Sequence, residues 1–281
     1  MLKQRVISGI VLVIIGLVTM LLGGKVLGMT LLIISEIGLF ELYRVMKMDN
    51  TPMACCGYVC TAFYYLYLFL KDSKAAPGFF HEGILVIVIP LTLLCLFFFV
   101  INYPKYSAAQ LFATVFGFLY VPVMLSYIFR TREEIRLGEW IVFMIFLASW
   151  VSDTCAYFVG RMLGKKKLAP VLSPKKTVEG SLGGIIGSAV LSAVYGLLMC
   201  INVGEPYFII AIFAVIGAAG SAISQIGDLA ASGIKRNYEI KDYGNLIPGH
   251  GGILDRFDSV IITAPIVFYL AYFLIDIGNK L

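Results

Sequence analysis

Long apolar runs separated by short polar stretches dominate the chain from end to end. A helix needs about 20 mostly apolar residues to cross a bilayer. Nine segments approach this length, at 6–23, 27–46, 53–70, 83–102, 108–129, 139–160, 181–203, 206–231 and 253–275. The second contains Glu36 and Glu41 and the third is short, so they are the weaker predictions. The pattern predicts an all-α polytopic membrane protein with about nine transmembrane helices.

Composition supports a lipid environment. Of the 281 residues, 60% are hydrophobic and 14% are charged, whereas soluble domains carry about 25% charged residues. The first segment is too long and too apolar for a signal-peptide core, and no A-x-A site follows it, so we expect a transmembrane helix. The six cysteines form no CxxC pair and are expected to be small buried hydrophobes.

Lysine and arginine predict the orientation, because they collect on the cytoplasmic side of membrane proteins. With nine spans and a cytoplasmic N-terminus, fifteen of the 22 Lys and Arg residues lie inside. This arrangement places the C-terminus outside and both long basic loops in the cytoplasm. His81 then falls in an external loop and is expected to be incidental.

The first polar region runs from Asp153 to Gly180. Asp153 interrupts an apolar helix, where an ionised carboxylate costs about 2.5–3.5 kcal/mol at the bilayer centre. It is therefore a functional candidate, although pairing with Arg161 or a loop lysine would also explain it. Five lysines follow, with the segment Ser173-Pro-Lys-Lys-Thr177 among them. Topology alone could explain the charge, but the hydroxyls and turn proline also suit an anion-binding loop.

The second polar region begins on the eighth segment. Steps of three or four residues place its polar side chains on one helix face, which must line a bundle interior or a wet cavity: Ser221, Ser224, Asp228, Ser232 and Lys235. Pro248-Gly-His250-Gly-Gly252 then opens directly into the ninth segment. Glycines allow close backbone approach, and a helix N-terminus offers N–H groups to a phosphate.

Three carboxylates predict a cation site. Asp255 and Asp258 share a face at the start of the ninth segment, and Asp228 could join them. Such oxygen ligands suit Mg²⁺ in a displacement at phosphorus. Helix capping and pairing with Arg256 would explain one of these acids but not all three. His250 is expected either to act at the phosphate site or to brace the glycine-rich turn.

These motifs resemble the phosphatidate cytidylyltransferases. The resemblance rests on Ser232-Gly-Ile-Lys235-Arg236, Lys241-Asp242 and Pro248-Gly-His-Gly-Gly-Ile-Leu-Asp255-Arg256-Phe-Asp258, with weaker support from 153–184. It implies that CTP and phosphatidic acid react with each other to give CDP-diacylglycerol and pyrophosphate. The implied cofactor is Mg²⁺, with or without a second cation. We expect catalysis by positioning and charge neutralisation. An integral protein of a bacterial plasma membrane is favoured, with an organelle membrane as the alternative and the active site facing the cytoplasm.

The resemblance also implies residue roles. The expected catalytic residues are Asp228, Asp255, Lys235, Arg236 and His250. The expected metal ligands are Asp228, Asp255 and Asp258. Contacts to CTP or to the lipid phosphate are expected from Ser173, Lys175, Lys176, Thr177, Ser224, Ser232, Lys241, Gly251, Gly252 and Arg256.

The expected organisation is a single membrane domain over 1–281, with scaffold helices in 1–137 and catalytic helices and loops in 138–281. The bilayer is one expected partner and a second copy of the chain is another, because the Gly180–Gly184 and Gly183–Gly187 spacings indicate close helix packing or a dimer contact. No nucleic-acid partner is expected.

Other functions fit less well. A transporter should distribute polar residues through the membrane depth. A CDP-alcohol phosphotransferase should carry D-G-x-x-A-R, which is absent, and Gly160-Arg-Met-Leu-Gly164-Lys-Lys departs from a P-loop. A CTP-dependent lipid kinase is the remaining enzyme alternative.

Overall fold

The computed structural model describes residues 2–71 and 83–277. His81 and the chain ends, residue 1 and residues 278–281, lie outside the described residues. Helices form almost all of the described chain, which confirms the all-α prediction. The single sheet of the described residues is a two-stranded hairpin.

Seven helices among the described residues are long and apolar enough to cross a membrane. Seven of the nine predicted segments correspond to these helices. The other two correspond to shorter apolar helices, Ser8–Leu22 and Leu85–Ile101. A span needs about 20 apolar residues, with about 17 as the lower limit. By length and composition the described residues therefore support an integral membrane protein with seven candidate spans.

The chain divides into two compact units, which we describe separately. The first comprises Met1–Ser126 with Asp242–Asp255, and the second Tyr127–Lys241 with Arg256–Leu281. The sequence analysis placed the boundary between scaffold and catalytic parts at residue 137. It grouped the loop before α11, residues 242–253, with the C-terminal helices; this loop contains Pro248–Gly252 and is called the signature loop below. In the structure, residues 242–255 instead group with the N-terminal helices.

The first unit consists of helices and the signature loop. Its helices are α1 (Leu2–Leu22), α2 (Gly24–Val45), α3 (Pro52–Leu70), α4 (Leu85–Ile101), α5 (Ala108–Phe118), the π-helical turn η2 (Leu119–Val123) and the start of α6 (Met124–Glu134). Tyr43 lies at its centre and is fully buried, and its hydroxyl donates to the Thr114 carbonyl oxygen at 2.7 Å. Gly57 and Gly117 leave the space that this ring occupies. The buried Tyr43 therefore fixes α2 against α3 and α5.

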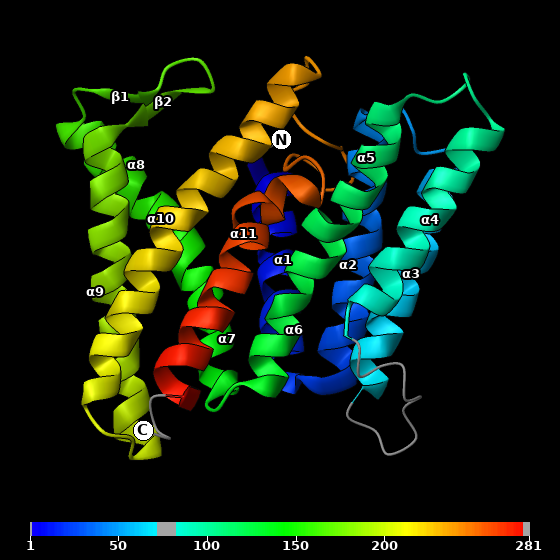
Figure 1. Ribbon diagram of the computed structural model, residues 1–281. Coiled ribbons are helices and arrows are strands. Elements are labelled where there is room, and N and C mark those ends of the chain that lie inside the picture. The colour runs from blue at the N-terminus through cyan, green and yellow to red at the C-terminus, as the bar shows by residue number, and fades with distance from the viewer. Residues whose placement is uncertain (1, 72–82, 278–281) are drawn as a thin grey trace. The chain divides into compact units, whose positions relative to one another are not determined.

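The second unit contains the long C-terminal helices. Its elements are the rest of α6, α7 (Gly138–Phe146), the π-helical turn η3 (Leu147–Val151), α8 (Ser152–Leu163), strands β1 (Lys167–Ala169) and β2 (Ser173–Thr177), α9 (Val178–Val203), α10 (Phe208–Asn237), most of α11 (Leu254–Ala271) and the π-helical turn η4 (Tyr272–Ile277). The antiparallel β1–β2 hairpin joins the end of α8 to the start of α9 (Figure 1). The basic segment predicted as a shaped loop is therefore a short hairpin.

Small residues allow α8 and α9 to pack closely. A Cβ at Gly183 or Gly187 of α9 would collide with Val159 or Cys155 of α8. Gly184 lies against Ser152 in the same way. Small residues are typical of close helix contacts in membranes. The glycine spacings are therefore used for packing within the chain.

Candidate active site

The signature loop of the first unit is a tight turn that leads into α11. Ile247 and Gly251 pair across it, with the Ile247 N–H donating to the Gly251 carbonyl oxygen at 2.9 Å. Gly249 and Gly251 have φ of 78° and 86°. Side chains rarely adopt this left-handed region, so the Pro-Gly-His-Gly segment can turn back on itself here because it contains these glycines.

Glu41 of α2 caps the start of α11. Its two carboxylate oxygens accept the N–H groups of Ile253 at 3.1 Å and Leu254 at 2.8 Å. The side chain is only 3% exposed. Gly244 and Gly252 lie directly against the carboxylate and leave no room for a Cβ. The sequence analysis used Glu41 only as an argument against a transmembrane helix in the second segment. An acid within an apolar span is, however, itself an indication of function.

Asp255 braces the same loop. Its Oδ2 accepts the N–H of Tyr243 at 2.8 Å and that of Gly252 at 3.0 Å. The Arg44 guanidinium donates to the Tyr243 carbonyl oxygen at 3.0 Å. Together, Glu41 and Asp255 accept the N–H groups of residues 252, 253 and 254. The expectation that these donors are free for a phosphate is therefore wrong, because carboxylates of the chain occupy them.

His250 is held by α1. The hydroxyl of Ser8 lies 2.9 Å from His250 Nδ1 and donates to the Pro248 carbonyl oxygen at 3.2 Å. Gly9 lies against the same ring. These contacts favour the bracing interpretation of His250 over a role at a phosphate.

Three carboxylates and two lysines form an acidic cluster in the second unit. Lys176 of β2 pairs with Asp228 of α10. Lys235 Nζ lies 3.8 Å from Asp258 Oδ2, and the two side chains are 12% and 14% exposed. Asp153 of α8 interacts electrostatically with Asp228 and Lys176. The loop-lysine alternative for Asp153 thus has partial support. Of the three carboxylates predicted to share a site, Asp228 and Asp258 interact electrostatically within this cluster.

Gly227 sets the spacing of this cluster. A Cβ at this position of α10 would lie 3.2 Å from the Asp258 carbonyl oxygen and 3.4 Å from Ile262 Cβ. The backbones of α10 and α11 therefore meet beside Asp228 and Asp258. The Asp258 carboxylate also accepts its neighbour's N–H, from Ser259 at 2.8 Å.

The cluster fits a cation that arrives with a phosphate ligand better than a closed metal cage. Within the described parts of the chain, no group of three His, Cys, Asp or Glu side chains could hold a metal ion alone. Asp255 belongs to the first unit, with its carboxylate bonded to the loop. Mg²⁺ commonly takes only one or two carboxylates together with substrate phosphates. Asp228 and Asp258 supply such a pair.

The predicted polar stripe lies on a single helix, α10. Ser221 is fully buried and donates to Ser152 Oγ at 2.7 Å. Ser224 is also fully buried, and its hydroxyl has no hydrogen-bond partner among the described residues. Ser232, nearer the end of the helix, is half-buried. The stripe thus faces the interior, as its spacing predicted.

The remaining predicted basic residues follow the stripe. Arg236 donates to the Ile240 carbonyl oxygen at 3.3 Å. Lys241 and Arg256 are exposed, like Arg236. All three lie in the second unit with the acidic cluster.

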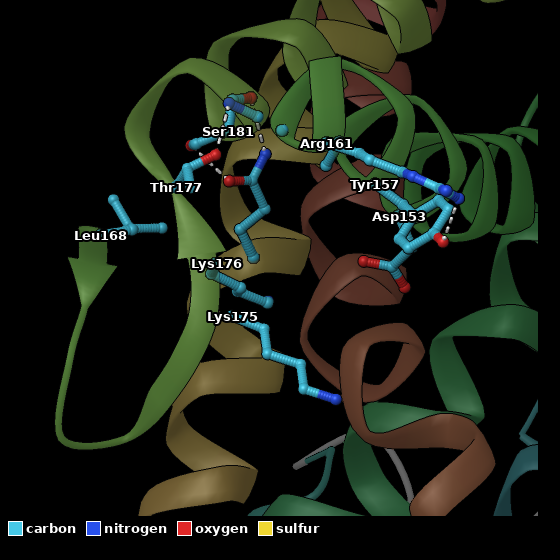
Figure 2. A pocket seen from close by; sticks show the side chains of 12 residues that line it. Asp153, Tyr157, Arg161, Leu168, Lys175, Lys176, Thr177 and Ser181 are labelled. Atoms are coloured by element: carbon cyan, nitrogen blue, oxygen red, sulfur yellow. Dashed lines mark hydrogen bonds between the residues drawn. The ribbon is translucent and has the colours of Figure 1, made fainter. Parts of the chain in front are cut away.

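A cavity of about 270 Å³ lies between α8, β2, α9 and α10. Figure 2 shows Asp153, Tyr157 and Arg161 on one side and Lys175 and Lys176 on the other. Arg161 donates to the Tyr157 hydroxyl at 3.3 Å. The predicted Thr177, Lys175 and Lys176 line this space, whereas Ser173, at the start of β2, does not.

Two cavity residues were missed by the sequence interpretation. Gln225 Nε2 donates to the Ser181 carbonyl oxygen at 3.1 Å, and the Ser181 hydroxyl donates back to the Gln225 amide oxygen. Ser181 lies within the 153–184 stretch that supports the resemblance, and Gln225 is a polar residue within an apolar segment, but neither was singled out. This pairing joins α9 to α10 at the wall of the cavity.

The hairpin that carries Lys175 and Lys176 is fixed at its base. Glu179 accepts the N–H groups of Lys165 at 3.0 Å and of Lys166. Thr177 caps α9 by accepting the Gly180 N–H at 3.1 Å. A Cβ at Gly160 would lie 2.8 Å from the Thr177 hydroxyl. The chain between α8 and α9 is therefore held at both ends.

Comparison with known proteins places this architecture in a family. A family model described as "Cytidylyltransferase family" matches residues 3–274. A phosphatidate cytidylyltransferase of Bacillus subtilis (strain 168) is 32% identical over 271 residues, which cover 95% of this chain and 97% of the relative. Proteins of the same name from Staphylococcus saprophyticus and Staphylococcus aureus (strain COL) are each 32% identical, over 265 and 273 residues, with 94% of this chain and 97% of each relative covered. The resemblance seen in the motifs is confirmed, and this chain belongs to the cytidylyltransferase family of enzymes.

Proposed function

We propose that this enzyme transfers the cytidylyl group of CTP to phosphatidic acid, giving CDP-diacylglycerol and pyrophosphate. The observation that carries the proposal is the nearly complete match to relatives named phosphatidate cytidylyltransferase, which spans both the signature loop and the acidic cluster. The basic cavity beside that cluster is chemically suited to phosphate-bearing substrates.

The reaction is a direct displacement at phosphorus. An oxygen of the lipid phosphate attacks the α-phosphorus of CTP, a new P–O bond forms, and the bond to the bridging oxygen of the β-phosphate breaks. Pyrophosphate leaves with that electron pair. The attacking oxygen already carries negative charge, so the protein needs little acid–base chemistry. Its task is to bring anionic groups together and to stabilise their charge.

Asp228 and Asp258 would hold Mg²⁺ together with oxygens of the CTP phosphates. When bound, the cation neutralises charge on the phosphates and on the leaving pyrophosphate. Lys176 and Lys235 pair with these two carboxylates. In our proposal, both lysines exchange their carboxylate partners for phosphate oxygens when substrate enters. In our proposal, Asp255 supports catalysis indirectly, by holding the signature loop in place through its hydrogen bonds to Tyr243 and Gly252.

In our proposal, basic residues of α10, the following loop and the first turn of α11 bind the triphosphate. These residues all belong to the second unit with Asp228 and Asp258: Lys235, Arg236, Lys241 and Arg256. We propose that this face is cytoplasmic, since the Lys and Arg distribution favours it and CTP is a cytoplasmic nucleotide. A bacterial plasma membrane agrees with the bacterial relatives.

The test is label transfer in purified protein. The enzyme in detergent is incubated with phosphatidic acid, Mg²⁺ and CTP labelled at the α-phosphate, and label in the lipid phase is measured. Asp228→Asn and Asp258→Asn are expected to abolish transfer without loss of the folded protein. Lys167→Gln serves as the control, because Lys167 is an exposed lysine of β1 that does not line the cavity.

Two results would contradict the proposal. Folded wild-type protein that transfers no α-label to lipid is not a phosphatidate cytidylyltransferase under these conditions. Transfer of γ-label instead would identify a lipid kinase, because a kinase moves the terminal phosphoryl group.

A further inference from the structure

The cavity of the second unit has the chemistry of a phosphate site. Arg161 of α8 and Lys175 and Lys176 of β2 supply positive charge to its wall. Thr177 supplies a hydroxyl group and Tyr157 a phenol, whereas the Ser181 hydroxyl at the same wall donates to Gln225. Arginine and lysine beside hydroxyl donors bind phosphate oxygens through short, charge-assisted hydrogen bonds.

The size of the cavity restricts the ligand. At about 270 Å³ it is slightly smaller than the sites of about 300–1,000 Å³ that enclose drug-sized molecules. A phosphate with its glycerol fits such a space, whereas a whole nucleoside triphosphate is drug-sized or larger. The volume therefore favours a head group over CTP.

The cavity wall is continuous with an apolar helix surface. Tyr157 lines the cavity and is still 59% exposed. Phe158 and Met162 are exposed on the same helix, at 56% and 79%, as is Leu182 on α9. Both helices belong to candidate spans, so exposed apolar side chains on them are available to contact lipid acyl chains. A head group in the cavity can thus leave its acyl chains along α8 and α9.

The cavity also adjoins the acidic cluster. Lys176 lines the cavity and pairs with Asp228, and Asp153 belongs to both groups. A phosphate held by Arg161 and Lys175 would therefore have an oxygen near Lys176 and Asp228, and Asp228 is one of the two carboxylates that would hold the cation in the proposed reaction. This is where the nucleophile of the proposed reaction must lie.

We infer that this cavity binds the phosphomonoester head group of phosphatidic acid through Arg161 and Lys175, while the cations of α10 and its following loop bind the triphosphate. The inference rests on the proposed function and divides the two substrates between two sets of basic residues. Lys176 is shared, since it reaches both the cavity and the acidic cluster.

The experiment measures binding without turnover. Full-length protein in detergent with EDTA and no nucleotide is titrated with dioctanoyl phosphatidic acid, and dioctanoyl phosphatidylcholine serves as a lipid without a phosphomonoester. Arg161→Gln and Lys175→Gln are each expected to weaken phosphatidic acid binding about tenfold or more, as for the loss of a charged hydrogen bond. Lys167→Gln removes a lysine of the same hairpin that does not line the cavity, so its binding should stay within about twofold.

Further measurements test the role of the charge and the source of the phosphate. Arg161→Lys keeps the positive charge and should recover part of the phosphatidic acid binding. Such recovery would show that Arg161→Gln weakens binding through loss of charge and not through misfolding. In steady-state assays the KM for phosphatidic acid should rise in Arg161→Gln while the KM for CTP stays unchanged. Inorganic phosphate should compete weakly, because it lacks the acyl chains.

The outcomes distinguish this inference from the proposed function. Unchanged phosphatidic acid binding in both glutamine variants, or a rise in the KM for CTP instead, would overturn the inference and leave the cytidylyltransferase reaction intact. Arg161-dependent binding by a protein that transfers no label would overturn the proposed reaction and support the lipid-phosphate site.

Discussion

Replacing Glu41 by glutamine tests whether the start of α11 depends on a carboxylate that lies 212 residues from Ile253 in the sequence. The glutamine side chain has nearly the same shape, but it offers one acceptor oxygen where the carboxylate offers two. Its amide NH₂ would face an N–H group of the loop, so one hydrogen bond is lost and two donors oppose each other. Glu36→Gln, on the same helix, is the matched control, because no hydrogen bond of Glu36 is found among the described residues.

The size of the effect follows from the two bonds at 3.1 and 2.8 Å. A hydrogen bond to a charged group contributes about 1.5–3 kcal/mol, and a buried donor left without an acceptor carries a desolvation cost. Glu41→Gln should therefore destabilise the loop by about 1.5–3 kcal/mol, and Glu41→Ala by roughly twice that. If the ordered loop is required for turnover, Glu41→Gln should lower kcat/KM by about ten- to a hundredfold, because about 1.4 kcal/mol corresponds to a factor of ten.

Two measurements check this prediction. Label transfer gives kcat/KM, and hydrogen–deuterium exchange of the 243–254 segment reports on loop order. Glu41→Gln should speed exchange in this segment while leaving exchange in α9 unchanged. Equal activity and exchange in Glu41→Gln and Glu36→Gln would show that the cap is dispensable and that the reasoning is wrong.

Three further predictions concern the second unit. Gly227→Val should destabilise the protein by about 1–3 kcal/mol through overpacking against α11, lowering its melting temperature in detergent, and an unchanged melting temperature would refute the close contact with the Asp258 backbone. Lys176→Met should tighten Mn²⁺ binding to the substrate-free protein, measured by electron paramagnetic resonance, because the lysine ammonium group no longer pairs with Asp228. Unchanged Mn²⁺ affinity would argue against Asp228 as a ligand. Glu179→Gln should raise the KM for phosphatidic acid more than that for CTP, since it loosens the base of the hairpin, and an equal change in both would count against that role.

Much of the helical architecture could be predicted, because apolar runs of span length leave few alternatives. Ser221 and Ser224 were placed on one interior face from their spacing alone, and both are buried on α10, while Asp228, one turn further along, is half-buried. The β1–β2 hairpin was not predicted, because its lysine-rich segment has no apolar alternation to mark strands. The position of the hairpin depends on the hydrogen bonds that the Glu179 carboxylate accepts from the backbone N–H groups of Lys165 and Lys166.

The units were harder to predict than the elements, because grouping depends on contacts between distant segments. The signature loop precedes α11 in sequence, and proximity along the chain suggested that it belongs with the C-terminal helices. In the structure it joins the N-terminal unit through Glu41, Arg44 and Ser8. Helices assigned only a scaffold role therefore supply direct hydrogen bonds to the signature loop.

The start of α11 shows how a correct physical argument selected an incorrect ligand. An N-terminus with free N–H groups attracts an anion, and the sequence analysis expected a phosphate there. The anion is instead the Glu41 carboxylate, with Asp255 beside it. Both facts were visible in the sequence as unexplained features, a buried acid in one apolar segment and unsatisfied donors at the start of another. Because lipid offers no hydrogen bonds to either group, each required a partner from the protein, and matching the two would have predicted this contact.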